Sequence, residues 1–208
     1  MALDYPEEAI LRNNQCIIND ILKQKASLEI NNFSLKEDFK NDCSHVSFVL
    51  QFKDGETSEK LKIKNTGSGV IDALFTGVIN QFLDTYISLR DITLYDFIVS
   101  VDFKESKSAF KTDAPVEVKI VLQGTSRSHN KLYFKAKSNS IVKAGIAAVC
   151  GAIEYLINAE LAVVQLSKDI KFAEERRRRD LRETYLSQLL ELINLVSYAE
   201  VINKLNEE

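Results

Sequence analysis

The chain has 208 residues, of which 45% are hydrophobic and 27% charged, so it is long enough and apolar enough to bury the core of one domain. Its 27 basic and 30 acidic side chains give a formal net charge of −3, which excludes a general attraction to nucleic acid or anionic lipid. The longest uninterrupted apolar run, residues 144–153, is about half of the roughly 20 residues that a membrane-spanning helix needs. We therefore expect neither a nucleic-acid partner nor a membrane span.

The cysteines indicate the redox setting. Cys16, Cys43 and Cys150 are an odd number at wide spacing, and acidic residues rather than an apolar leader follow the first methionine. This pattern is typical of a reducing environment, so we expect a cytoplasmic protein.

The first predicted element is an amphipathic helix within residues 7–25. Its apolar positions recur at helical intervals: Ile10, Cys16, Ile17, Ile21 and Leu22. Such a helix needs a partner surface.

Strand patterns come next. Residues 46–52 and 60–64 alternate between apolar and polar side chains, and the link Asp54-Gly55-Glu56 is typical of a hairpin. After residues 66–69 the apolar period becomes helical, which predicts a helix that ends near Ser88.

The same order then recurs. Alternating residues predict strands at 95–103, 116–122 and 132–136, and a helical pattern follows from Ser140. The stretch FSLKEDF at 33–39 corresponds to ITLYDF at 92–97, and SGVIDALFTGVI at 68–79 corresponds to NSIVKAGIAAVC at 139–150. We predict an α+β fold in which a strand, strand, strand, helix unit is duplicated, at 33–88 and 92–158. The alternative is that all strand-to-helix turns look alike.

Two helical segments flank this predicted domain of residues 33–158. Residues 1–32 hold the N-terminal helix, and residues 159–208 form a long helical extension. The apolar positions of the extension are three or four residues apart: Leu181, Tyr185, Leu189, Leu192, Val196, Ala199 and Ile202. The extension should pack on another helix, of this chain or of a second one.

Two motifs resemble a known family. The first holds Gly67, Gly69, Ile71, Asp72, Ala73 and Leu74, the second Ser138, Ile141, Val142 and Ala144, and a strand start adds Leu94, Asp96 and Phe97. Together they resemble the C-terminal regulatory domain of α-isopropylmalate synthase and (R)-citramalate synthase. Val70, Ser140 and Gly145 stand where that family usually has proline, an acidic residue and serine.

The resemblance implies two pseudo-twofold units, a homodimer, and a branched-chain amino acid (leucine or isoleucine) bound between the units as an allosteric inhibitor. The catalytic barrel of the family, with its metal-binding H-x-H pair, has no counterpart among the roughly thirty residues that precede the matching region. The only histidines, His45 and His129, are not paired in that way.

The two helix-start turns form the predicted ligand site. Free N–H groups and the helix dipole after Gly67-Ser68-Gly69 suit a carboxylate, and Asp72 suits an ammonium group. The full predicted set is Gly67, Ser68, Gly69, Asp72, Ala73, Ser138 and Ser140. The structural alternative is a tight glycine turn in the first unit and ordinary N-cap residues in the second.

Catalytic and metal chemistry find little support in the sequence. Cys43 and His45 are two residues apart, but no further Cys or His is close in sequence, so we predict neither a metal site nor a cofactor. No nucleophile has a base beside it, and we predict that the chain is not an enzyme. The arginine run at 176–179 is flanked by acidic residues and predicts a solvated helix face.

Two functions remain open. The chain is either a regulatory domain that dimerises, binds a branched-chain amino acid and acts on a partner enzyme, or a ligand-free scaffold that assembles through its terminal helices. The small residues at 144–152 predict a seam, between subunits or within one.

Overall fold

The computed structural model describes residues 6–105, 113–124, 131–193, 198 and 201–203. The helices are α1 (Pro6–Ile21), α2 (Val70–Ile79), α3 (Ile141–Glu175) and α4 (Arg179–Ile193), with a short 3₁₀ helix η1 (Ile87–Asp91). The strands are β1 (Ser27–Asp38), β2 (Cys43–Asp54), β3 (Thr57–Gly67), β4 (Ile92–Val101), β5 (Val116–Gly124) and β6 (Lys131–Ser138). The predicted α+β class is confirmed.

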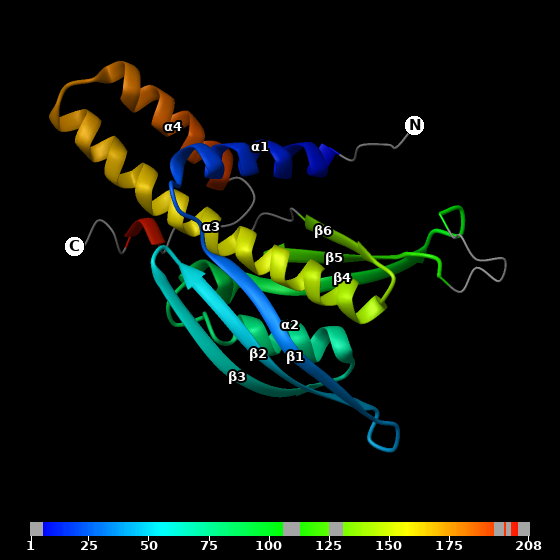
Figure 1. The fold of residues 1–208 in the computed structure, drawn as a ribbon. Helices are drawn as coiled ribbons and strands as arrows, with labels where there is room; N and C mark the ends of the chain where they lie inside the picture. Colours follow the sequence, from blue (N-terminus) through cyan, green and yellow to red (C-terminus); the bar gives the residue numbers. More distant parts are fainter. Residues whose placement is uncertain (1–5, 106–112, 125–130, 194–197, 199–200, 204–208) are drawn as a thin grey trace.

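The strands form two separate antiparallel sheets of three, in the orders β1-β2-β3 and β4-β5-β6 (Figure 1). The predicted hairpin at 54–56 is confirmed: Asp54 pairs with Thr57 across a two-residue turn. Gly55 has φ +59° there, the left-handed conformation that glycine adopts at little steric cost.

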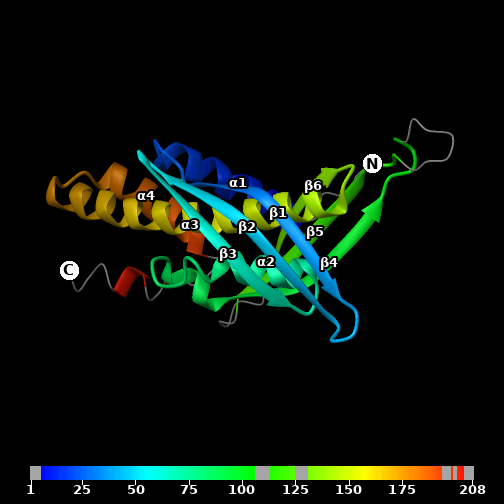
Figure 2. The same cartoon turned by 60° about the horizontal axis from the view of Figure 1, so that its bottom comes forward.

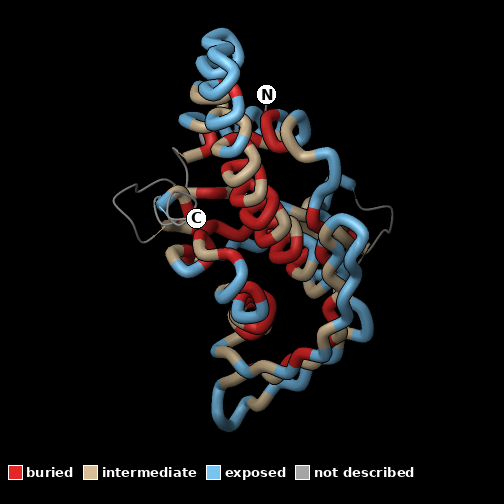
Figure 3. The backbone as a smooth tube through the Cα atoms, turned by 90° about the vertical axis from the view of Figure 1, so that its left-hand side faces the viewer, coloured by how far each residue is buried: buried red, intermediate tan, exposed pale blue. Residues whose placement is uncertain are grey.

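Helix α3 lies at the centre of the molecule and contacts strands of both sheets as well as α1, α2, η1 and α4 (Figure 1). The predicted start is confirmed, because Ser140 is the N-cap and its hydroxyl accepts a hydrogen bond from the N–H of Lys143 at 3.4 Å. The buried segments in Figure 3 gather in the interior, and α3 carries buried residues from Ala144 to Ala173. The core is therefore organised around this helix.

Polar side chains of α3 fix the neighbouring segments. Asn158 accepts a hydrogen bond from the N–H of Ala26 at 2.8 Å and donates one to its carbonyl at 2.9 Å. Glu154 accepts a hydrogen bond from the N–H of Leu28. These contacts hold the beginning of β1 against the middle of α3.

The predicted helix reaching Ser88 is wrong in its second half, because α2 ends at Ile79. The carboxylate of Glu160 accepts hydrogen bonds from the N–H groups of Ile87 and Ser88, at 3.2 and 3.0 Å, and from the Ser88 hydroxyl at 2.6 Å. A helix running through these residues would use the same N–H groups internally.

The helical extension folds back on α3. After α3 the chain turns at Arg177, which has φ +56°, and α4 packs antiparallel against α3 (Figure 1). The helical partner predicted from the sequence thus belongs to the same chain. Leu192, Tyr198 and Val201 are buried there. Val196 and Ala199 lie outside the described residues.

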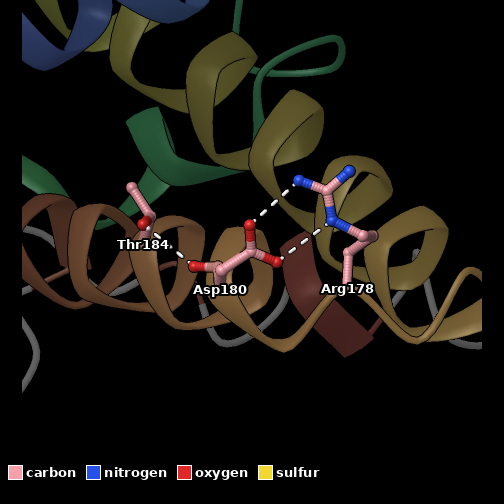
Figure 4. A network of polar contacts seen from close by, with 3 residues as sticks. All are labelled: Arg178, Asp180 and Thr184. Atoms are coloured by element: carbon pink, nitrogen blue, oxygen red, sulfur yellow. Dashed lines mark hydrogen bonds and ion pairs between the residues drawn. The ribbon is translucent and has the colours of Figure 1, made fainter.

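The arginine run is exposed, as predicted, but it lies at the turn between α3 and α4 instead of on one helix face, and only Arg179 belongs to a helix. Arg178 forms a bidentate pair with Asp180, at 2.9 and 3.1 Å, in front of the first turn of α4 (Figure 4). This pair lowers the pKa of Asp180 to about 2. The Thr184 hydroxyl donates to the Asp180 carbonyl one helical turn earlier.

Helix α1 packs against α3, β6 and α4. Ile17 and Ile18 are buried, whereas Ile10 is 42% exposed and Cys16 is exposed. The predicted helix is confirmed, but these last two side chains do not belong to its buried face.

By length and composition, α3 is the one helix of the described ranges that could cross a membrane. Of its most apolar 18-residue window, 72% is buried inside the protein, which is typical of a core helix. The helix is weak support for a membrane span.

Candidate functional site

A groove of about 560 Å³ runs between β1 and the first turns of α3. Val142, Ile146 and Cys150 of α3 line it at intervals of four residues, which places them on one helix face. Leu28 and Ile30 line it from β1, where alternate residues face the same side. The apolar residues of these two elements thus form one continuous wall of the groove. Phe33 and Ala147 also belong to this wall.

Polar groups lie at one end of this wall. Ser140, the N-cap of α3, lines the groove together with Lys143 in the first turn. A helix start carries free N–H groups and a partial positive charge, so this end of the groove attracts anions. Glu29 of β1 lines the groove toward its other end, because the N–H of the adjacent Leu28 bonds Glu154, several helical turns along α3 from Ser140.

The thiol in the groove is chemically inert. Burial, with the nearby Glu154 carboxylate, raises the pKa of Cys150 to about 12. The thiol therefore stays protonated at neutral pH and acts as a small apolar side chain rather than as a nucleophile.

The predicted site residues of the first turn lie elsewhere. Asp72 Oδ2 accepts hydrogen bonds from the N–H of Ser68 at 2.9 Å and from its hydroxyl at 3.1 Å. Ala73 is fully buried, and Gly67 and Gly69 do not line the groove. The Asp72 carboxylate is thus bonded to Ser68 within the turn.

The two predicted residues of the second turn, Ser138 and Ser140, lie in different depressions of the surface. The Ser138 hydroxyl accepts a hydrogen bond from the N–H of Ser140 at 3.3 Å, and Ser138 lines a separate depression with Lys137 and Asn139. Of the seven predicted residues, the structure places only Ser140 in the groove. The β1 residues were missed, although the alternation of Leu28 and Ile30 is a strand signal just before the predicted domain boundary.

The two helices that follow these turns touch directly. A β-carbon on Gly145 of α3 would lie 2.6 Å from Cδ1 of Ile71 in α2, so glycine permits this close approach. The predicted seam of small residues is thus intramolecular at Gly145.

No protein-family model matches the chain. A search of the curated proteins also finds no match. The resemblance to the synthase regulatory domain therefore depends on the motif residues alone and stays a prediction.

Proposed function

We propose that this chain is a non-catalytic regulatory module that binds a branched-chain amino acid in the groove between β1 and α3. One observation carries the proposal: the groove joins an apolar wall to a helix start that carries a basic residue, Lys143. Leucine and isoleucine combine a carboxylate with a branched apolar side chain in one small molecule.

The carboxylate and the side chain of such a ligand each have a counterpart. The carboxylate would bind at the start of α3, near Ser140 and Lys143, where the dipole and the ammonium group of Lys143 favour an anion. The branched side chain would contact Ile30 and Ile146. This pose moves the predicted site from the two turns to the groove beside one of them.

We further propose that the fold arose by duplication of a βββα unit. The order β1-β2-β3-α2 is followed by β4-β5-β6-α3, and both sheets are antiparallel with consecutive strand order. Contact between α2 and α3 supports a pseudo-twofold arrangement of the two units. On this proposal, α3 is the second-unit helix, lengthened to carry α4.

Thermal unfolding with leucine, isoleucine and valine tests the ligand. Binding should stabilise the protein by about 2.7 kcal/mol when the ligand is a hundredfold above its dissociation constant. Ala147→Trp, which fills the groove, and Lys143→Met should reduce this stabilisation. Lys168→Met, at an exposed position of the same helix, is the matched control and should not. A wild-type chain that none of the three stabilises would rule out the proposal.

A second candidate function is assembly, and strand β4 favours it. Phe97, Val99 and Val101 are 40%, 37% and 43% exposed, although they share a face with the core of the second sheet. In the first sheet the corresponding strand β1 contacts α3 along part of its length. We propose that a second copy of the chain covers β4, giving a homodimer that would present the module to a partner enzyme.

A further inference from the structure

The turn between β1 and β2 brings three side chains with metal-binding atoms together. Asp38 and Cys43 are direct cross-strand partners, and His45 follows two residues later on the same face of β2. The Cys43 sulfur lies 3.7 Å from His45 Nε2, and one atom from each of the three side chains lies within 4.8 Å of the others. This end of the hairpin projects away from the helices (Figures 1 and 2).

Neighbouring groups fix the orientation of the imidazole. His45 Nδ1 is hydrogen-bonded to the Thr66 hydroxyl of β3 at 2.8 Å, so Nε2 is the ring nitrogen that faces Cys43. Metal-binding histidines usually have a partner of this kind on the second nitrogen, which sets the tautomer and the ring plane.

The carboxylate is held from the turn itself. Asp38 Oδ1 accepts hydrogen bonds from the N–H groups of Lys40 and Asn41, at 3.1 and 3.2 Å, and Oδ2 accepts one from the Asn41 side chain at 2.8 Å. A carboxylate has about four acceptor positions, so these three contacts leave room for one more. The turn thus holds Asp38 beside the other two side chains before any ion arrives.

We propose that Asp38, Cys43 and His45 form a binding site for zinc or a similar divalent ion. A tetrahedral zinc ion with bonds of 2.0 to 2.3 Å separates its ligand atoms by about 3.3–3.8 Å, the range that contains the Cys43 to His45 distance. On binding, the S–H bond of Cys43 is replaced by a sulfur–metal bond and the proton goes to solvent. Water fills the fourth position.

The chemistry of the three atoms selects the class of ion. Sulfur and imidazole nitrogen suit zinc and cobalt, whereas magnesium and calcium bind almost entirely through oxygen. Cys43 and His45 are neighbours in the sequence. Asp38 joins them through the pairing of β1 with β2.

Cobalt(II), added as its chloride to the full chain under a thiol-free reductant, is the probe. We expect one equivalent to produce the near-ultraviolet charge-transfer absorption of a cobalt–thiolate bond, which an equivalent of zinc then removes. Cys43→Ser should abolish the absorption. Cys16→Ser, at an exposed cysteine of α1, should leave it unchanged.

Two further variants distinguish a site made of three ligands from cobalt binding by the Cys43 thiol alone. Asp38→Asn and His45→Gln should each weaken cobalt binding by more than tenfold, while circular dichroism shows that both remain folded. A wild-type chain without the absorption would overturn the proposal. An absorption that survives Cys43→Ser, or one that neither Asp38→Asn nor His45→Gln weakens, would overturn it as well.

Discussion

A β-carbon on Gly67 would lie 2.4 Å from the backbone nitrogen of Ala73, a distance that no side chain can adopt. The end of β3 therefore lies directly against the first turn of α2. We expect Gly67→Ala to destabilise the fold by about 2 kcal/mol or more, because backbone atoms rather than a flexible side chain must move. Chemical denaturation measures this change.

The nearby Gly69 is the matched control. Its added β-carbon would meet no atom within 4 Å, and its φ of −170° is accessible to any residue. Gly69→Ala should change the free energy of unfolding by less than about 0.5 kcal/mol. Equal effects at both positions would contradict the close contact.

Asn158 is a buried polar side chain of α3 that is predicted to be costly to remove. Asn158→Ala leaves the buried N–H and carbonyl of Ala26 without their side-chain partners, so unfolding free energy should fall by about 2–3 kcal/mol. Gln165→Ala, which removes a contact with Asp169 on the same helix, should cost less than about 0.5 kcal/mol. A comparable loss at both positions would show that the contact with β1 is unimportant.

The carboxyl group of Glu154 makes stability depend on pH. Burial raises its pKa above the ordinary value of 4.5 in the folded protein. The folded state therefore binds the Glu154 proton more tightly than the unfolded state does. The stability that Glu154 gains from this is complete below the ordinary pKa of 4.5 and is lost as pH rises through the folded pKa. We expect Glu154→Gln to be more stable, relative to wild type, at pH 8 than at pH 4.

Denaturation curves at a series of pH values test this expectation. Glu59→Gln, at an exposed position of β3, is the control and should show no such trend. If Glu154→Gln were instead more stable relative to wild type at pH 4 than at pH 8, the expectation would be wrong.

The exposed apolar strand predicts a change in oligomeric state. Val99→Lys should convert the proposed homodimer into a monomer, because a charge at the centre of the β4 surface cannot be buried unpaired. Leu190→Lys, at a 57% exposed position of α4, should leave the dimer intact. Sedimentation of the wild type and both variants decides this, and a wild-type monomer would remove the assembly proposal.

The sequence predicted helices and strands correctly where neighbouring residues alone determine the local structure. The hairpin at Gly55 and the start of α3 at Ser140 follow from short-range chemistry, and both are confirmed. The helix was expected to reach Ser88, but the N–H of Ser88 bonds Glu160, a residue about 70 positions later in the chain. Nothing in residues 80–88 alone indicates that contact.

The candidate groove was predictable only in part for the same reason. Ser140 is a recognisable N-cap, but its neighbours across the groove come from β1, which is remote in sequence. Asp72 matched a ligand-binding motif, yet its carboxylate is satisfied by Ser68 within the turn. Motif residues identify a type of turn, whereas the groove depends on which strand lies opposite that turn.

The central position of α3 also sets the order in which the chain can fold. The hydrogen bonds from Asn158 and Glu154 to the beginning of β1 span 132 and 126 residues. Contacts this distant in sequence form late, because closing a long loop costs chain entropy before any contact forms. During synthesis, the first sheet would leave the ribosome with its edge at β1 uncovered until most of α3 has followed.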